Sequence, residues 1–232
     1  MNEFAQISVT FGVVLSLAAY EVGLFIRKKT QKAFCNPLLI SIVIVILCLS
    51  VLGIEYKNYQ SSAKYLSYLL TPATVCLAIP LYRQYELLKG NYKAILGGIA
   101  VGSVTSLLSV LVLASLFKMS YEQYVTLLPK SITTAIAIGV IEELGGYTTI
   151  TVVVIIVTGV VGNMLAEWVL RTFRINNSIA KGVAIGTASH AIGTTKAMEM
   201  GSVEGAMSSL SIVIAGIITV VLTPFFAQFL SY

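Results

Sequence analysis

The feature that most constrains this chain is a succession of apolar runs about twenty residues long, separated by short basic segments. Hydrophobic residues make up 57% of the sequence and charged residues only 11%, and the mean hydropathy is +0.90. A soluble domain carries roughly a quarter charged residues, whereas a run of about twenty apolar residues is long enough to cross a bilayer as a helix. The sequence therefore predicts an all-α, polytopic integral membrane protein whose solvent is the lipid bilayer.

The whole chain, residues 1–232, is interpreted as a single transmembrane domain. The second span begins at Asn36-Pro37, because asparagine caps helices and proline suits the first helical position. Full spans are predicted over about 7–26, 37–54, 94–117, 148–170 and 207–229.

Basic residues gather in three places, 27–32, 83–93 and 171–181, and the formal net charge is +5. We interpret these clusters as cytoplasmic loops beside an anionic leaflet, so no nucleic-acid partner is expected. The first cluster is the strongest and predicts an external N-terminus. If all three clusters are cytoplasmic, the broken segment 65–84 crosses the membrane and the broken segment 121–146 returns to its starting side. If the two segments are equivalent repeats, one cluster is misplaced, and the sequence leaves both topologies open.

Two apolar segments are interrupted by proline, at Pro72 and at Pro129. Proline removes a backbone donor and collides with the preceding turn, so a continuous helix is not expected at either position. With an offset of 57 residues, Pro72 aligns with Pro129 and Gly102 with Gly159. The sequence therefore predicts broken or re-entrant helices and an internal repeat, with units of about 63–117 and 120–170. Paired interruptions of this kind indicate transporter binding sites, so we expect the two prolines to lie close together near the bilayer midplane.

Small hydroxyl residues and one lysine follow the two breaks. Broken helices present unpaired N–H groups and a positive dipole end, which attract anions. The alternative is that the hydroxyls only satisfy freed backbone groups and that the lysine extends to the interface. The predicted substrate-binding residues at the breaks are Thr71, Thr74, Lys130, Ser131, Thr133 and Thr134.

The only histidine, His190, lies in a polar stretch between glycines, Gly186–Lys196. This stretch is too polar for lipid contact, and His190 has either a structural role or a role as proton relay or anion contact. Thr194, Thr195 and Lys196 are added to the predicted substrate site. Glu21 and Glu199 are possible proton carriers, whereas Glu167 and Arg171 are expected to form an i,i+4 pair. Close helix approach is predicted at Gly182-xxx-Gly186 and Gly201-xxx-Gly205.

No motif for an enzyme, a metal or a cofactor is present. A single histidine, no aspartate and no GxSxG motif argue against a hydrolase. Cys35, Cys48 and Cys76 show neither a disulfide framework nor metal-ligand spacing. We therefore expect neither an enzyme nor a bound metal or cofactor.

Five stretches carry a family resemblance: NPLLISI (36–42), LLTPATVCLAIPLYRQ (69–84), LLPKSITTAIAIGV (127–140), GTASHAIGTTKAME (186–199) and EGAMSSL (204–210). They resemble the LrgB/CidB family of bacterial membrane proteins over nearly the whole chain.

The resemblance implies a multi-pass protein of the bacterial plasma membrane. It also implies an antiholin-like role in murein hydrolase export and cell lysis, exercised with a small LrgA/CidA-type partner. Relatives are implicated in carrying small monocarboxylates such as pyruvate or glycolate. Three classes of function compete: a carrier of small organic anions, a lysis regulator that acts as a homo-oligomer, and a structural partner of another membrane protein.

Overall fold

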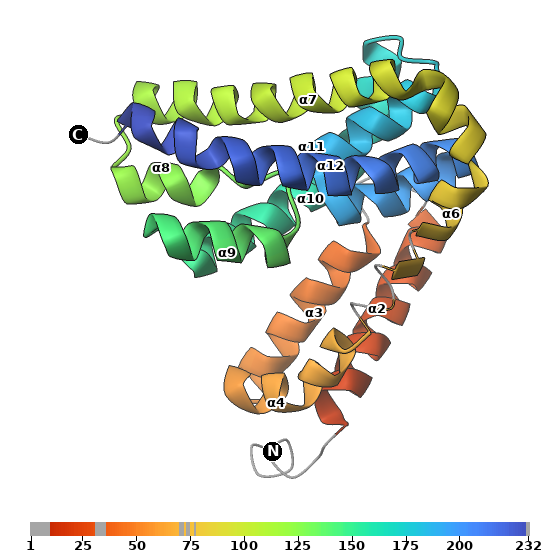
Figure 1. The fold of residues 1–232 in the computed structure, drawn as a ribbon. Helices are drawn as coiled ribbons and strands as arrows, with labels where there is room; N and C mark the ends of the chain where they lie inside the picture. Colours follow the sequence, from red (N-terminus) through yellow and green to blue (C-terminus); the bar gives the residue numbers. More distant parts are fainter. Residues whose placement is uncertain (1–9, 31–35, 70–71, 73–74, 77, 231–232) are drawn as a thin grey trace. The chain divides into compact units, whose positions relative to one another are not determined.

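The computed structural model describes residues 10–30, 36–69, 72, 75–76 and 78–230. Within these ranges every regular element is a helix, which confirms the predicted all-α class (Figure 1). The chain divides into two compact units, 1–76 and 77–232. That the chain forms one transmembrane domain with repeat units 63–117 and 120–170 stays a prediction.

The first unit contains α2 (Phe11–Thr30), α3 (Pro37–Val51) and α4 (Tyr56–Ser67). Glycines let these helices approach closely. The Gly12 N–H donates to Ser62 Oγ at 2.8 Å, and a Cβ on Gly23 would lie 2.6 Å from the Pro37 carbonyl oxygen. The start of α2 thus contacts α4, and its second half contacts α3.

The predicted start of the second span is confirmed. Asn36 Oδ1 accepts hydrogen bonds from the N–H groups of Leu38 at 2.9 Å and Leu39 at 3.3 Å, and Pro37 takes the first helical position. The break predicted at Pro72 cannot be followed in the same way. Pro72 is helical, but its neighbours at 70–71 and 73–74, which include the candidates Thr71 and Thr74, lie outside the described residues.

Three helices of the second unit are long and apolar enough to cross a membrane: α7 (Tyr85–Leu116), α10 (Thr148–Thr172), and α12 (Ser202–Ala227) with its 3-10 extension η1 (Gln228–Leu230). The short α6 (Ala78–Arg83) precedes them. The span predicted to start at residue 94 begins at Tyr85, because the polar turns ahead of the apolar run are helical too.

A hairpin separates α7 from α10. It consists of α8 (Tyr121–Leu127) and α9 (Thr134–Leu144), joined by a buried turn at Pro129, which confirms the predicted break. The chain enters along α7, since Tyr124, Val125 and Leu128 pack in one cluster with Leu107, Val110 and Ala114. It then returns: the N–H of Tyr147 donates to Thr126 Oγ1 at 2.8 Å. We call residues 121–144 the first hairpin and 128–133 its tip.

A second reversal lies inside α11 (Ser178–Met200), where His190 has φ 40° and ψ −137°. In a straight helix, residues eight apart are separated by about 12 Å along the axis. Here a Cβ on Gly193 would lie 3.2 Å from the Ile185 carbonyl oxygen, so the chain folds back on itself. We call residues 178–200 the second hairpin and His190 its tip. Its first half is 178–189 and its second half is 191–200.

The two hairpins enter the second unit from opposite ends. The first half of the second hairpin runs parallel to α7, because Gly98 faces Val183 and Gly102 faces Thr187. The second hairpin therefore enters where α7 begins and α10 ends, whereas the first hairpin enters where α7 ends and α10 begins.

The two tips meet beside α10. Ile155 packs with Ile132 of the first tip, and its carbonyl oxygen lies 3.0 Å from His190 Nε2 of the second tip.

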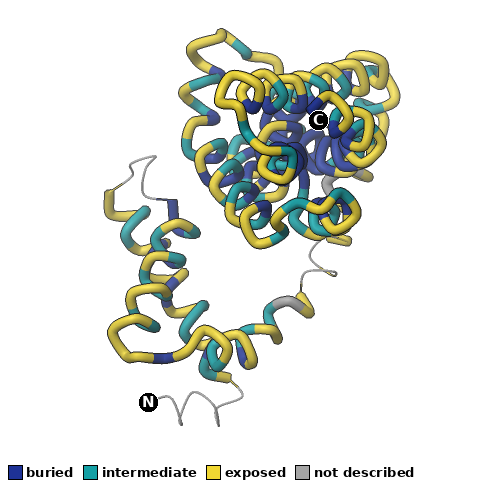
Figure 2. Tube along the Cα trace, turned by 90° about the vertical axis from the view of Figure 1, so that its left-hand side faces the viewer, coloured by how far each residue is buried: buried dark blue, intermediate teal, exposed yellow. Residues whose placement is uncertain are grey.

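Buried residues fill the interior of the second unit, while the outward faces of its helices are largely exposed (Figure 2). The close approach predicted at Gly182 and Gly186 is confirmed, since a Cβ on either would overlap the backbone of α12 at Glu204 or Ser208. Small residues thus set the spacing between the second hairpin and the final span.

Candidate functional site

Lys130 lies at the tip of the first hairpin and binds two hydroxyls. Its Nζ donates to Ser131 Oγ at 3.1 Å and to Ser106 Oγ of α7 at 3.2 Å, and the two hydroxyl oxygens are 3.0 Å apart. An ammonium group has three N–H donors. The third donor of Lys130 has no partner among the described residues.

The charge of Lys130 is not neutralised by the part of the chain that the structure describes. The ion pairs between described residues involve Lys196 and Arg171, not Lys130. A cation held away from water is costly unless it is paired. A hydroxyl pair solvates the ammonium without cancelling its charge, so the position favours an anion.

A groove of about 780 Å³ leads to Lys130 between α7 and the first half of the second hairpin. Its walls are mostly small and apolar, and its polar groups lie at the two ends. The residues along it are Asn91, Ala94, Ile95, Gly98, Val101, Gly102, Thr105, Ser106 and Ser109 of α7, Lys130 and Ser131, and Asn177, Ile179, Ala180, Val183, Ala184, Thr187 and Ala188.

Two buried hydroxyls near this site have no hydrogen-bond partner in the structure. Thr187 lines the groove and is 5% exposed, and Ser103 lies one residue from Gly102, which Thr187 contacts. Buried hydroxyls are nearly always bonded, often back to their own helix. The Thr187 hydroxyl is therefore available to a polar occupant of the groove.

His190 and Thr194 form a separate buried cluster at the second tip. The Ile155 carbonyl can only accept, so His190 Nε2 donates to it. Thr194 Oγ1 donates to the His190 carbonyl oxygen at 2.9 Å and lies 2.7 Å from Ser208 Oγ of α12. Gly159 makes room for the imidazole, since a Cβ there would lie 2.8 Å from its Cε1. These contacts fix the reversal of the second hairpin.

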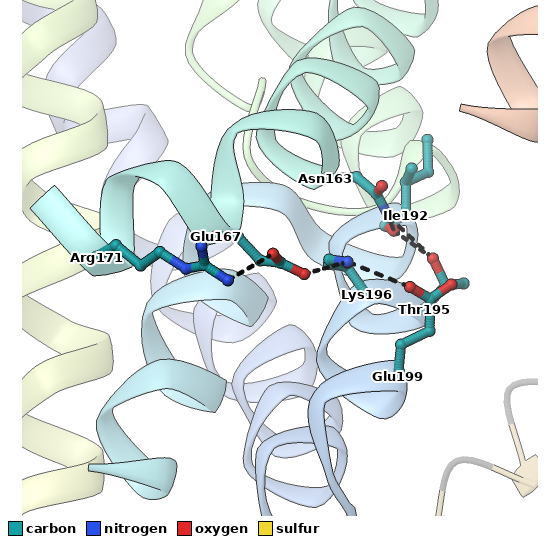
Figure 3. A network of polar contacts seen from close by, with 7 residues as sticks. All are labelled: Asn163, Glu167, Arg171, Ile192, Thr195, Lys196 and Glu199. Atoms are coloured by element: carbon teal, nitrogen blue, oxygen red, sulfur yellow. Dashed lines mark hydrogen bonds and ion pairs between the residues drawn. The ribbon is translucent and has the colours of Figure 1, made fainter. Parts of the chain in front are cut away.

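Lys196 and Glu199 lie in a third group, an ion-pair network on the second half of the hairpin (Figure 3). Lys196 Nζ is 2.6 Å from Glu167 Oε1 and 3.4 Å from Glu199 Oε2. The predicted i,i+4 pair is confirmed, with Arg171 3.5 Å from Glu167.

The same network takes in Asn163 of α10. Its amide nitrogen donates to the Ile192 carbonyl at 2.8 Å and to Thr195 Oγ1 at 3.1 Å (Figure 3). The structure thus separates Thr195 and Lys196 from Lys130.

The remaining predicted residues do not join Lys130. Thr133 is the N-cap residue of α9 without a side-chain capping bond, and Thr134 begins that helix; neither lines the groove. Glu21 is exposed on α2 of the first unit. Among the described residues, no group of three or more histidine, cysteine or acidic side chains could hold a metal ion.

Sequence reasoning missed Ser106 and Thr187. Ser106 lies inside an apolar span, where a single serine carries little information. A usable signal existed in the spacing of Ser103, Ser106 and Ser109, which repeats every three residues and places polar groups along one side of α7.

Residues 78–230 therefore form a membrane protein in which apolar spans surround two opposed re-entrant hairpins and an unneutralised cation. This is the arrangement in which membrane transporters build ion and substrate sites from broken helices. The chain belongs to the LrgB-like family, which it matches over residues 16–229.

Two bacterial relatives illustrate the match. The antiholin-like protein LrgB of Bacillus cereus (strain B4264) is 38% identical over 221 residues, covering 95% of this chain and 96% of the relative. The antiholin-like protein LrgB of Bacillus anthracis (strain CDC 684 / NRRL 3495) matches to the same extent. No solved structure matches this chain.

Proposed function

We propose that the chain binds a small monocarboxylate at Lys130 and carries it across the bacterial plasma membrane, which it crosses several times. One observation supports this most strongly: a lysine at a helix break is solvated by two hydroxyls and has no carboxylate partner in the described residues. A carboxylate would bind the remaining N–H of Lys130 and the hydroxyl of Ser131 or Ser106. No reaction is assigned to the site, because binding and release suffice for a carrier.

The expected strength of this contact can be stated. A hydrogen bond to a charged group contributes about 1.5–3 kcal/mol, and 1.4 kcal/mol corresponds to a tenfold change in affinity. The groove is larger than a pyruvate-sized acid needs. The acid would therefore occupy only the end that carries Lys130.

Uptake into proteoliposomes tests the proposal. Purified protein should carry labelled pyruvate, and Lys130→Ala and Ser131→Ala should impair uptake while leaving expression and membrane insertion intact. Lys57→Ala, a change of an exposed residue in α4, is the control and should have no effect. If transport survives both changes at the tip, the protein is a carrier but its binding site is not at Lys130 and Ser131.

A small LrgA/CidA-type membrane partner and a homo-oligomeric state are part of the proposal. The family resemblance supports the partner. Co-reconstitution with the partner decides whether one chain is sufficient. If neither the protein alone nor the pair moves pyruvate, the carrier proposal is wrong.

The names of the relatives favour a second function more directly than they favour transport. Relatives covering nearly the whole chain are called antiholin-like, so we propose as the alternative that this chain restrains murein hydrolase export and cell lysis. Deleting the gene should then accelerate lysis. Expressing the Lys130→Ala variant in the deletion strain should slow lysis as much as expressing the unaltered protein does. If restraint instead depends on Lys130, the two functions share one site.

A further inference from the structure

The groove that leads to Lys130 runs along the surface of the second unit, with exposed residues such as Val101 and Ala184 in its lining, and reaches one end of that unit. Asn91 and Asn177 line its outer end, near the start of α7 and at the N-cap of α11. Ser106 and Ser109 line its inner end beside Lys130. From Asn91 to Ser106 the groove follows α7 for fifteen residues, about 22 Å at 1.5 Å per residue. That length takes it from the membrane interface to the interior of a bilayer whose apolar core is about 30 Å thick.

Beyond Lys130 the route is closed by the first hairpin. Its α8 packs against α7 and the end of α12 in a dry cluster that includes Tyr124, Val125 and Leu128, each at most 1% exposed. The Tyr124 hydroxyl donates to the Phe226 carbonyl at 2.9 Å. On the other side, Thr151 Oγ1 donates to the Thr126 carbonyl at 2.9 Å. Hydrogen bonds and packing therefore seal the end that faces away from the groove.

The two ends also differ in charge. The closed end carries one basic residue, Lys118, and the acids Glu142 and Glu143 that end α9. The open end carries seven basic residues, Arg83, Lys89, Lys93, Arg171, Arg174, Lys181 and Lys196, and the acids Glu86, Glu167, Glu199 and Glu204. Short loops rich in lysine and arginine stay in the cytoplasm, so the open end is the cytoplasmic end.

We infer that the groove is the cytoplasmic entry path for small anions, and that the structure is the cytoplasm-open state of the protein. Basic residues at the mouth attract anions, and Lys130 ends the path. The wall that must move to close it is the first half of the second hairpin, which contributes Ala180, Ala184 and Ala188. This inference rests on the proposed function only for the identity of the anion.

Sided labelling of single cysteines in membrane vesicles tests the inference. In a chain whose three native cysteines are replaced by serine, Ala184→Cys and Ala188→Cys place a thiol in the groove. Lys118→Cys marks the closed end, and Val157→Cys marks an exposed position of α10 outside the groove. An impermeant anionic methanethiosulfonate should modify the groove cysteines at least tenfold faster in inverted vesicles than in right-side-out vesicles. Lys118→Cys should show the opposite preference.

Two results would overturn the inference. One is faster modification of the groove cysteines from the outside. The other is modification from the cytoplasmic side no faster than that of Val157→Cys, because the groove would then not admit the water-borne reagent.

Protection by pyruvate separates this inference from the proposed function. If the groove cysteines react faster from the cytoplasmic side but pyruvate does not slow their modification, the entry path stands and the pyruvate site is wrong. If pyruvate slows their modification but they react faster from the outside, the pyruvate site stands and the cytoplasmic path is wrong.

Discussion

Two lysines on the two hairpins show how differently this fold treats a positive charge. Lys196 is 16% exposed and is held between Glu167 and Glu199. Lys130 has only the hydroxyls of Ser106 and Ser131. Both positions are semi-enclosed, but only the first supplies its own counter-charge.

The difference separates structural charge from functional charge. A lysine that is fully paired within the chain has little to offer a ligand, and its loss mainly exposes its partners. A lysine solvated by neutral groups retains its net charge and can exchange one anion for another. Lys130 therefore is the candidate site, and Lys196 ties α10 to the second hairpin.

The largest loss of pyruvate affinity is expected when Lys130 is given a carboxylate partner within the chain. Ser106→Asp places a carboxylate where a hydroxyl now lies 3.2 Å from Nζ, which converts Lys130 into a paired lysine like Lys196. Affinity for pyruvate should fall by about a hundredfold or more, because the charged hydrogen bond is lost and a like charge repels the acid. Titration calorimetry checks this, with Ser115→Asp at the exposed end of the same helix as control. Unchanged affinity in Ser106→Asp would remove Lys130 from the site.

At the tip of the second hairpin, substitutions should change stability through the backbone conformation rather than through charge. His190 has a positive φ that disfavours residues other than glycine. His190→Ala and His190→Gly both lose the contact with Ile155, but only glycine accepts the conformation without strain. We expect His190→Gly to be more stable than His190→Ala by about 1 kcal/mol, measured by thermal unfolding in detergent. Greater stability of the alanine variant would contradict a strained tip.

Removing one hydroxyl from Lys130 should have a moderate effect. A hydrogen bond to a charged group contributes about 1.5–3 kcal/mol, but Ser131 stays bonded to Lys130, so Ser106→Ala should weaken pyruvate binding by about tenfold at most. Because Ser106 and Ser131 contact each other at 3.0 Å, the double change should differ from the sum of the single ones. Strict additivity in a double-mutant cycle would show that the two hydroxyls act independently.

The smallest effect is expected at the paired lysine. Lys196→Met removes one ion-pair partner of Glu167 and one of Glu199, but Glu167 keeps Arg171, and both carboxylates are over 40% exposed to water. Exposed pairs contribute about 0.2–1 kcal/mol, so the melting temperature should fall slightly while pyruvate binding is retained. A large loss of binding would show that Lys196 belongs to the site after all.

The parts of this fold that the sequence could predict are those with a local chemical cause. Proline at 129 breaks a helix wherever it packs, and Asn36-Pro37 starts one. The reversal at His190 has no such cause, because no proline is present and the glycines of that stretch are equally compatible with close packing of a straight helix. It depends on Gly159 and Gly162 of α10, which leave room for the side chains of His190 and Ser189.

The cation of the candidate site could be predicted from the sequence, but the residues that surround it could not. Lys130 and Ser131 follow a proline and were therefore expected at a break. Ser106 comes from a span that enters the site only because the first hairpin folds back along α7. Lys196 is predicted as a substrate residue because it follows the polar stretch at His190, whereas its partner Glu167 lies 29 positions away, and spacing alone does not show which distant residues meet.

Direct titration of pyruvate into three proteins tests the central claim that Lys130 is the anion-binding charge: the unaltered chain, Lys130→Met and Lys196→Met. Methionine keeps most of the length of either side chain and removes the ammonium group, with its charge and its N–H donors. We expect Lys130→Met to lose affinity by about ten- to a hundredfold and Lys196→Met to bind as the unaltered protein does. Equal binding by all three proteins, or loss confined to Lys196→Met, would contradict this claim.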